Sequence, residues 1–286
     1  MELLTILLSL AFVHLWDGRN PVQRDEWYWR WLTTLKGQDS LANNPIATLA
    51  VAIGVPVLMV LLALGILMSI SYWLLLPVSV LLLLYSFGRG PFEDPLEFYT
   101  SAHVCDNWNL GVQQAAELGV NVSAVVEGDW PRLHELVLRA AVYRGFERRF
   151  ATIFWFLILG PLGAIISRLC WLYKRGDEQL DETPSDQATR WLWLLEWPAV
   201  RVLGISFAVT GNFVGCFQRW RDCFFCRSRS ATDVLIQAVG GALSMDETAV
   251  AAEPVGRREL SALESLYRRT LWLWLGCIGL WAILVS

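Results

Sequence analysis

The chain contains one long stretch, residues 40–88, in which no residue is charged. Its apolar part, residues 46–87, is 42 residues long, and a single helix of that length would extend about 63 Å at roughly 1.5 Å per residue. The hydrocarbon core of a bilayer is only about 30 Å thick. Two helices that each cross a bilayer therefore fit the stretch better than one. We expect a transmembrane hairpin with helices at 46–66 and 70–87 and a break near residues 65–71.

The composition also indicates a membrane protein. Apolar residues make up 55% of the chain and charged residues 17%, against about 45–50% and about 25% in ordinary globular proteins. Mean hydropathy is +0.42. This balance excludes a disordered chain and a coiled coil, and a net charge of −4 gives no basic surface for nucleic acid. We expect the lipid bilayer to be a partner of this chain and nucleic acid not to be.

Two further apolar segments predict membrane helices. Residues 151–167 form an uncharged run of 17 residues, which is the lower limit for a span. The Gly160-Pro161 pair would kink this helix, and a bilayer helix tolerates a kink if its neighbours satisfy the freed carbonyl. Residues 271–286 close the chain, and their tryptophans suit a membrane–water interface.

Two segments leave the number of crossings open. Residues 3–16 are apolar but too few for an ordinary span, and they lack the basic start and cleavage site of a signal peptide. Residues 199–217 are mostly apolar but contain Arg201, and a charge at the bilayer centre costs at least about 3 kcal/mol. A crossing there would nevertheless gather the lysines and arginines on one side of the membrane. The segment is either a marginal span or a helix that lies in the interface.

Together these patterns predict an all-α, polytopic helical membrane protein with helical loops. The expected regions follow the chain in order. They are an N-terminal apolar helix and interfacial segment (1–45), a transmembrane hairpin (46–87), a helical soluble region (88–150), a central transmembrane helix (151–175), a loop with a membrane-associated helix at 199–217 (176–270), and a C-terminal transmembrane helix (271–286).

Motifs of known catalytic chemistry are largely missing from the sequence. There is no phosphate-binding glycine loop, dinucleotide motif, nucleophile elbow or zinc-protease motif. Three histidines, His14, His103 and His134, are too few for a histidine-based zinc site unless most of them converge. The Cys223-Phe-Phe-Cys226 motif has no second cysteine pair, which favours packing at the interface over a metal or redox role. We therefore expect no catalytic residue, no metal and no cofactor.

Charged residues that lie directly against the apolar segments form the candidate site. In a functional interpretation they line a pocket at the membrane edge for an anionic ligand, because the planar guanidinium fork suits phosphate and carboxylate. In a structural interpretation the arginines snorkel and anchor helix ends. Arg201 is hardest to explain as an anchor, because apolar residues follow it. The candidate ligand-binding residues are Glu147, Arg149, Arg168, Glu196 and Arg201.

The order of these segments resembles the AmpE-type β-lactamase regulatory membrane proteins. The resemblance is densest in RAAVYRGFERRFATIFWFLILGPLGAIISRLCWLYKR (139–175) and LLEWPAVRVLGISFAVTGN (194–212). It implies an inner-membrane protein linked to induction of a chromosomal β-lactamase, in one superfamily with the CobD/CbiB adenosylcobinamide-phosphate synthases. The positions that match the AmpE-type pattern are Arg149, Trp155, Arg168, Glu196, Trp197, Arg201 and Gly204.

The synthase branch of that superfamily joins a carboxyl group to an amine with ATP, and this sequence departs from its pattern. Glu147 is kept, but Arg148 replaces the asparagine that follows it. The Asn-Thr-Leu-Asp-Ser motif is replaced by CWLYK, which has no acid, and only Glu196 lies near the place of an Asp-Asp pair. Carboxylates normally hold Mg²⁺ beside the phosphates, so their loss argues against ligase chemistry.

These observations favour an inner-membrane regulatory or sensor protein linked to β-lactamase induction and the muropeptide stress response. The expected partners are the bilayer, an anionic small molecule such as a muropeptide or nucleotide, and a membrane protein. Two alternatives stay open. One is an ATP-dependent amide-forming enzyme related to the synthases, and the other is a structural subunit of an envelope complex.

Overall fold

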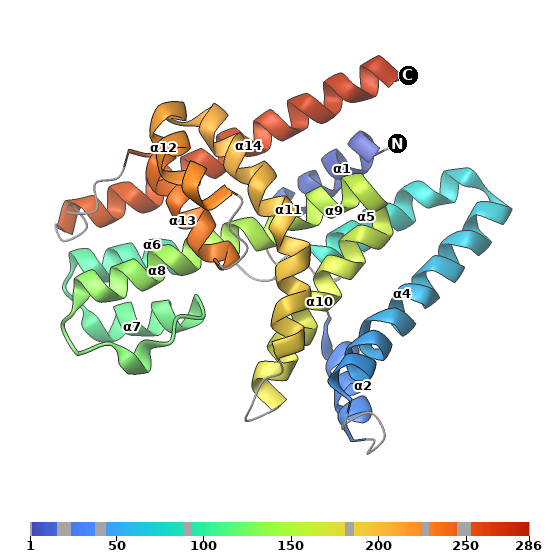
Figure 1. Cartoon of the computed structure of the whole chain (residues 1–286), viewed down its shortest axis with the longest axis horizontal. Coiled ribbons are helices and arrows are strands. Elements are labelled where there is room, and N and C mark those ends of the chain that lie inside the picture. Colours follow the sequence, from blue (N-terminus) through green and yellow to red (C-terminus); the bar gives the residue numbers. More distant parts are fainter. Residues whose placement is uncertain are drawn as a thin grey trace. The chain divides into compact units, whose positions relative to one another are not determined.

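A computed structural model describes residues 2–15, 24–37, 44–87, 93–180, 186–224, 229–244 and 253–285. Throughout these ranges the regular elements are helices and no strand forms (Figure 1). The prediction of an all-α fold is therefore confirmed.

The chain forms two compact units that are interleaved in sequence. Unit 1 comprises Met1–Arg89 and Arg148–Ala199, and unit 2 comprises Gly90–Glu147 and Val200–Ser286. The chain thus leaves unit 1, builds the first part of unit 2, returns to unit 1 and ends in unit 2.

Unit 1 contains two successive apolar helices in the segment where the sequence predicts a transmembrane hairpin. Its elements are α1 (Glu2–Leu15), α2 (Glu26–Lys36), α4 (Pro45–Ile70), the short 3₁₀ helix η1 (Tyr72–Leu74), α5 (Leu75–Ser86), α9 (Thr152–Leu159), α10 (Pro161–Leu180) and the first part of α11 (Asp186–Thr210).

The break of the hairpin lies later than the sequence suggested. Helix α4 begins with Asn44 as its N-cap and continues without interruption to Ile70, and the turn follows at residues 71–74. Serine does not end the helix, because the Ser69 hydroxyl donates to the Ile66 carbonyl at 2.7 Å within it.

The predicted central helix, residues 151–175, is two helices in the structure. Gly160 has φ +63° and ψ −151°, which ends α9 before α10 begins. In a straight helix, residues eight positions apart would lie about 12 Å from each other. Here a Cβ on Gly163 would lie 2.1 Å from the Trp155 carbonyl oxygen, so α10 folds back closely against α9. The kink expected at Gly160-Pro161 is a full interruption of the helix. The positive φ and the extended ψ of Gly160 are incompatible with helical backbone, and glycine adopts them at low cost.

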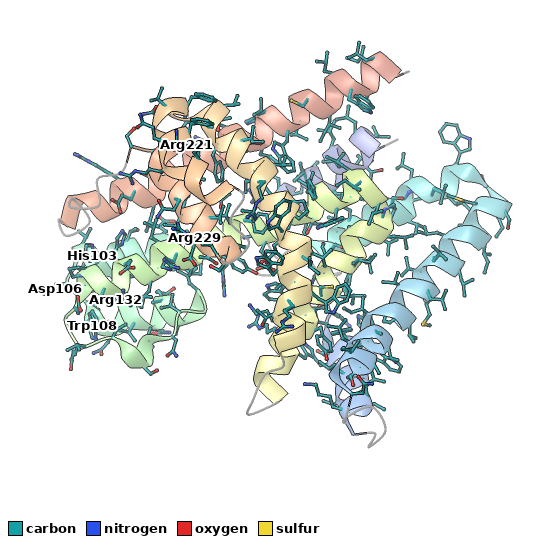
Figure 2. The ribbon with its side chains drawn as sticks, viewed as in Figure 1. His103, Asp106, Trp108, Arg132, Arg221 and Arg229 are labelled. Carbon is teal, nitrogen blue, oxygen red and sulfur yellow. The ribbon has the colours of Figure 1, made fainter. Side chains whose placement is uncertain are left out.

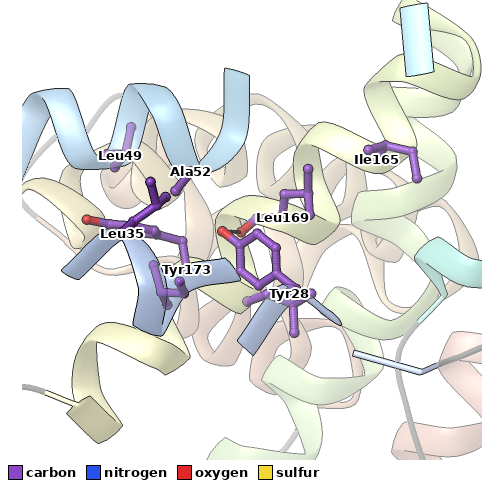
Figure 3. Packing of buried hydrophobic residues seen from close by; sticks show 9 residues of the cluster. Tyr28, Leu35, Leu49, Ala52, Ile165, Leu169 and Tyr173 are labelled. Carbon is purple, nitrogen blue, oxygen red and sulfur yellow. Dashed lines mark hydrogen bonds between the residues drawn. The ribbon is translucent and has the colours of Figure 1, made fainter. Parts of the chain in front are cut away.

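Three helices of unit 1 pack around a common core (Figure 3). Amphipathic α2 contributes Tyr28 and Leu35, α4 contributes Leu49, and α10 contributes Leu169 and Tyr173, all of them buried. The Tyr28 hydroxyl donates to the Leu169 carbonyl at 3.4 Å. The residues before the apolar hairpin are therefore joined to the helix that follows residue 160.

Unit 2 is also helical. It contains α6 (Glu93–Val104), α7 (Trp108–Glu117), the 3₁₀ helix η2 (Val122–Ala124), α8 (Trp130–Gly145), the second part of α11, α12 (Phe213–Phe224), α13 (Ala231–Ala242) and α14 (Glu253–Val285).

Helix α14 packs along the unit 2 part of α11 and against α8. The Trp274 indole donates to the Ser206 hydroxyl at 2.8 Å, and the ring of Tyr267 meets Phe207 edge-on at 5.3 Å. The Tyr267 hydroxyl donates to the Val142 carbonyl at 2.5 Å. These buried contacts fix the middle of α14, residues 267–274, against α8 and α11 within unit 2.

Two helices in the described part of the chain are long and apolar enough to cross a membrane. They cover Ile46–Ile70 and Thr189–Thr210, and the shorter apolar helices are Leu3–Leu15 and Leu75–Ser86. The second of the two includes residues 199–210 of the segment 199–217 that the sequence left ambiguous. That segment is not one helix, because α11 ends at Thr210 and α12 (Phe213–Phe224) begins after residues 211 and 212. The further crossings at 151–167 and 271–286 stay predictions, and at eight residues α9 is only about 12 Å long.

Candidate functional site

The five predicted site residues are distributed over both units. Arg149, Arg168 and Glu196 belong to unit 1, whereas Glu147 and Arg201 belong to unit 2. Three of them are almost inaccessible to solvent, with exposed fractions of 3% for Arg168, 9% for Glu196 and 5% for Arg201. Buried charges are expensive unless they are paired, so these three are held in specific surroundings.

Arg168 pairs with an acid that the sequence analysis did not single out. Its Nη2 donates to Asp25 Oδ2 at 2.9 Å, and both side chains are buried. Asp25 directly precedes α2, and Arg168 lies in the middle of α10. The pair therefore joins the two helices through a charge-assisted hydrogen bond in a low-dielectric environment.

The side chain of Asp25 does not cap helix α2, although its position predicts that it should. It occupies the N-cap of α2, where an aspartate normally accepts a hydrogen bond from the first turn, yet its side chain caps no backbone N–H. The carboxylate is directed to Arg168 instead. A local preference is thus overridden by a tertiary ion pair, which is the pattern expected at a functional or strained position.

Aromatic side chains surround this pair on three helices. The Trp27 indole of α2 donates to the Tyr85 hydroxyl of α5 at 3.1 Å. On α10 the guanidinium of Arg168 lies 5.2 Å from the centre of the Trp171 ring, and that of Arg175 lies 5.3 Å from it. Arginine over a tryptophan ring gains a cation–π attraction that grows as water is removed.

One N–H donor of the Arg168 guanidinium makes no hydrogen bond within the described residues. Among the described residues, Arg168 Nε is buried and has no hydrogen-bond partner. The indole nitrogen of Trp31, on α2, is also buried and has no hydrogen-bond partner among the described residues. Buried donors are almost always satisfied, so these two nitrogens are candidates to hold an acceptor group of a ligand.

Glu147 and Arg149 lie in a six-residue π-helical segment, Phe146–Ala151, between α8 and α9. Such segments are rare and occur often at functional sites. The sequence carries no local sign of this geometry, although it does place FERRFA directly before an apolar run. Both side chains are partly exposed.

Glu196 and Arg201 flank Pro198 inside α11. A proline within a helix cannot donate to the carbonyl four residues before it. Near this point the Leu195 carbonyl accepts a hydrogen bond from the Trp155 indole at 3.1 Å. Both charged residues fall within a helix that is apolar enough to cross a membrane, where ionisable side chains are costly and usually functional.

Unit 2 contains a second buried polar network that sequence reasoning missed. His134 Nε2 lies 3.1 Å from Glu259 Oε2, and His134 Nδ1 lies 3.5 Å from the Tyr99 hydroxyl. All three side chains are buried. Burial raises the pKa of Tyr99 well above its ordinary value, so this hydroxyl stays protonated. The network joins α6, α8 and α14 through one histidine.

His103 stacks beside this network, with its ring centre 6.2 Å from that of His134. It also meets Trp130 edge-on at 4.8 Å, and Trp130 donates from its indole to Asp106 at 2.7 Å. Figure 2 labels His103, Asp106 and the neighbouring Trp108 at one end of this bundle. Two of the three histidines therefore do converge.

This convergence does not produce a metal centre in the described part of the chain. No group of three His, Cys, Asp or Glu side chains there could hold a metal ion. His14 belongs to unit 1, and Cys226 of the Cys-x-x-Cys motif lies outside the described residues. The burial of His134, Glu259 and Tyr99 favours a structural link between helices over catalysis on a substrate.

The family model described as "Regulatory signalling modulator protein AmpE" matches residues 1–256. No curated protein and no solved structure matches the chain.

Proposed function

The chain belongs to the AmpE family of regulatory signalling modulators, and from this premise we propose that it is an inner-membrane sensor. Its role would be to link the muropeptide stress of a damaged cell wall to the induction of a β-lactamase. The family supports regulation and signalling. The membrane location, the ligand and the output are our proposal.

The membrane location is supported by the exposed surface of α4. Only 17% of its most apolar window is buried within the protein, and large side chains point outward along it, among them Met59 at 66%, Leu62 at 58% and Ile66 at 62% exposed. An apolar surface of this size on a soluble monomer would cause association. A bilayer is the natural solvent for it.

The observation that carries the sensor role is the buried Asp25–Arg168 pair. We propose that the carboxylate of Asp25 occupies the position that an anionic group of the ligand would take on Arg168. A ligand that displaces Asp25 would release the start of α2 from α10, and the left-over donors of Arg168 and Trp31 would receive further oxygens. The ligand's effect would then be a shift between two arrangements of α2.

The same proposal covers the other predicted site residues. In unit 1, Arg149 and Glu196 would bind the anionic ligand or maintain the helices in the arrangement that the ligand favours. In unit 2, Glu147 and Arg201 would maintain the helices of that unit. We place the family beside the CobD/CbiB synthases on sequence resemblance, and a membrane-protein partner would carry the signal onward.

The test is the thermal midpoint of the protein purified in detergent, measured with anhydro-muropeptide and separately with Mg-ATP. Binding to the folded state raises the midpoint as ligand concentration increases. We expect a rise with muropeptide that is lost in Arg168→Ala and kept in Arg175→Ala. Both arginines lie over Trp171, but Arg175 is exposed, which makes it the matched control.

A second variant keeps the test informative if Arg168→Ala does not fold. Asp25→Asn retains the cation but removes its internal competitor, so the apparent affinity for muropeptide should increase. A midpoint that rises with Mg-ATP alone would overturn the proposal in favour of an ATP-dependent amide-forming enzyme. No rise with either compound would overturn it in favour of a structural subunit of an envelope complex.

A further inference from the structure

Helix α12 of unit 2 presents large apolar side chains to the outside. Phe213 is 58% exposed, Val214 62% and Phe217 48%. Phe213 and Phe217 are four residues apart and stack with nearly parallel rings at 6.0 Å. Residues at this spacing share one face of a helix, so the exposed side chains form a continuous apolar strip.

The orientation of this strip is fixed by the opposite side of α12. Cys216 is fully buried, and a Cβ on Gly241 of α13 would lie 2.5 Å from both the Gly215 carbonyl oxygen and the Cys216 Cα. Glycine allows the two backbones to approach this closely. Helix α12 cannot rotate about its axis without losing this contact, so the strip faces outward in the folded unit.

The strip continues from a helix that is apolar enough to cross a membrane. That segment, Thr189–Thr210, ends two residues before α12 begins. Its unit 2 part also exposes apolar side chains, with Ile205 at 48% and Val209 at 59%. The backbone N–H of Asn212, between α11 and α12, donates to the Ala242 carbonyl at the end of α13 at 2.8 Å, and this bond stabilises the corner between α11 and α12. The start of α12 therefore lies where the span ends.

The charges of α12 lie toward its far end. The first six residues, FVGCFQ, are uncharged, and Arg219, Arg221 and Asp222 follow. Arg221 comes four residues after Phe217, on the same face, and is exposed (Figure 2). An arginine there can lay its methylene stem along apolar surface and direct its guanidinium to phosphate groups.

We propose that α12 lies in the headgroup layer of a bilayer that contains anionic phospholipid, with Phe213, Val214 and Phe217 at the acyl boundary and Arg221 at the lipid phosphates. The helix has 12 residues and is about 18 Å long, too short to cross a hydrocarbon core of about 30 Å. An apolar strip with basic residues is the composition of interfacial helices, and anionic lipid attracts their arginines. This inference rests on the membrane location within the proposed function and extends it to a specific lipid contact.

The experiment uses the full chain reconstituted into phosphatidylcholine vesicles with and without phosphatidylglycerol. A fluorescent amino acid is introduced at one site at a time, replacing Val214 or Phe217. Leu62 of α4 serves as the bilayer control, and exposed Asn109 of α7 as the aqueous control. Quenching by brominated lipid reports contact with the bilayer, and quenching by iodide reports contact with water.

We expect sites 214 and 217 to be quenched by lipids brominated near the headgroup and site 62 by lipids brominated deep in the chains. Phosphatidylglycerol should increase the quenching at site 214, and Arg221→Gln should abolish that increase. Iodide quenching at sites 214 and 217 that is as strong as at site 109 would overturn the inference, because the strip would then face water. Protection of sites 214 and 217 from both quenchers would also overturn it, because protein would then cover the strip. Lipid quenching at site 62 in either case would leave the proposed membrane location intact, whereas iodide quenching at site 62 would refute that location.

Discussion

Asp25 Oδ2 and Arg168 Nη2 lie 2.9 Å apart in a buried ion pair, although 143 positions separate them in the chain. Removing one partner leaves the other charge buried and uncompensated. We expect Asp25→Ala and Arg168→Met each to lower the free energy of unfolding by about 3–5 kcal/mol. The double variant should lose less than the sum of the two, because it removes both charges together.

Chemical or thermal unfolding of the four proteins of this double-mutant cycle measures the coupling. The exposed Arg30 of α2 provides a control, since Arg30→Ala should be close to wild type. Additive effects of the two single changes would show that the pair contributes nothing as a pair.

The backbone at Gly160 predicts a sensitive position. Its φ of +63° and ψ of −151° lie in a region that is essentially accessible only to glycine, and a side chain there costs of order 1–3 kcal/mol. Gly160→Ala should destabilise the protein by that amount in a thermal or denaturant melt. Gly54→Ala is the matched control, because a Cβ on Gly54 meets nothing within 4 Å and that residue is already helical. Equal stability of the two variants would argue against the turn between α9 and α10.

Glu259 should matter for stability through its contact with His134. In Glu259→Ala, His134 Nε2 loses its partner at 3.1 Å in a buried site, which costs about 1–3 kcal/mol. Glu259→Gln keeps an acceptor at that place and should recover much of the loss. The exposed Glu264 of the same helix offers a comparison in which alanine should have little effect. If both alanine variants melt alike, the network does not hold α14 to α8.

The Arg139–Asp233 ion pair predicts a dependence of stability on acid pH. The Ser230 hydroxyl, which donates to the Asp233 carboxylate at 2.7 Å, and then Arg139 hold the pKa of that carboxyl below its ordinary value. A depressed pKa in the folded state contributes stability above the unfolded pKa of about 4, and this contribution is lost as the pH falls through the folded value.

The pair is partly exposed, so the effect should be small. Wild type should melt higher than Asp233→Asn at pH 6, and the difference should shrink below about pH 4. A difference that stays constant down to pH 3 would mean that Asp233 acts through packing and not through its charge.

Much of the helical architecture could be predicted from the sequence, because it depends on local properties. Hydropathy alone indicated the apolar segment in which α4 and α5 form, and Gly160-Pro161 marked the point at which the next apolar run breaks. The turn after α4 lies later than expected, since a serine inside a helix can donate to a backbone carbonyl of the preceding turn, as Ser69 does to Ile66. Whether the chain bends or reverses its direction at Gly160 depends on how α9 packs against α10, and no local sequence pattern encodes that packing.

The candidate site was harder to predict, for a physical reason. Arg168 was conspicuous because it ends an uncharged run, but an aspartate before an amphipathic helix is an ordinary N-cap, so Asp25 gave no signal. Its role depends on a partner 143 positions away. The His134–Glu259 contact spans 125 positions and was equally hidden. Pairings over such separations are set by the tertiary fold, and one sequence alone carries no trace of them.

The interleaving of the two units has a consequence for the order in which the protein is made. Domains usually fold as units while the ribosome is still adding residues, beginning with the N-terminal one. Here unit 1 cannot close until residues 148–199 have been synthesised, and by then the whole first part of unit 2 has already emerged. More than a hundred residues must therefore be synthesised between α2 and α10 before the two helices can pack together. A nascent chain that stops before Arg168 contains neither unit in full.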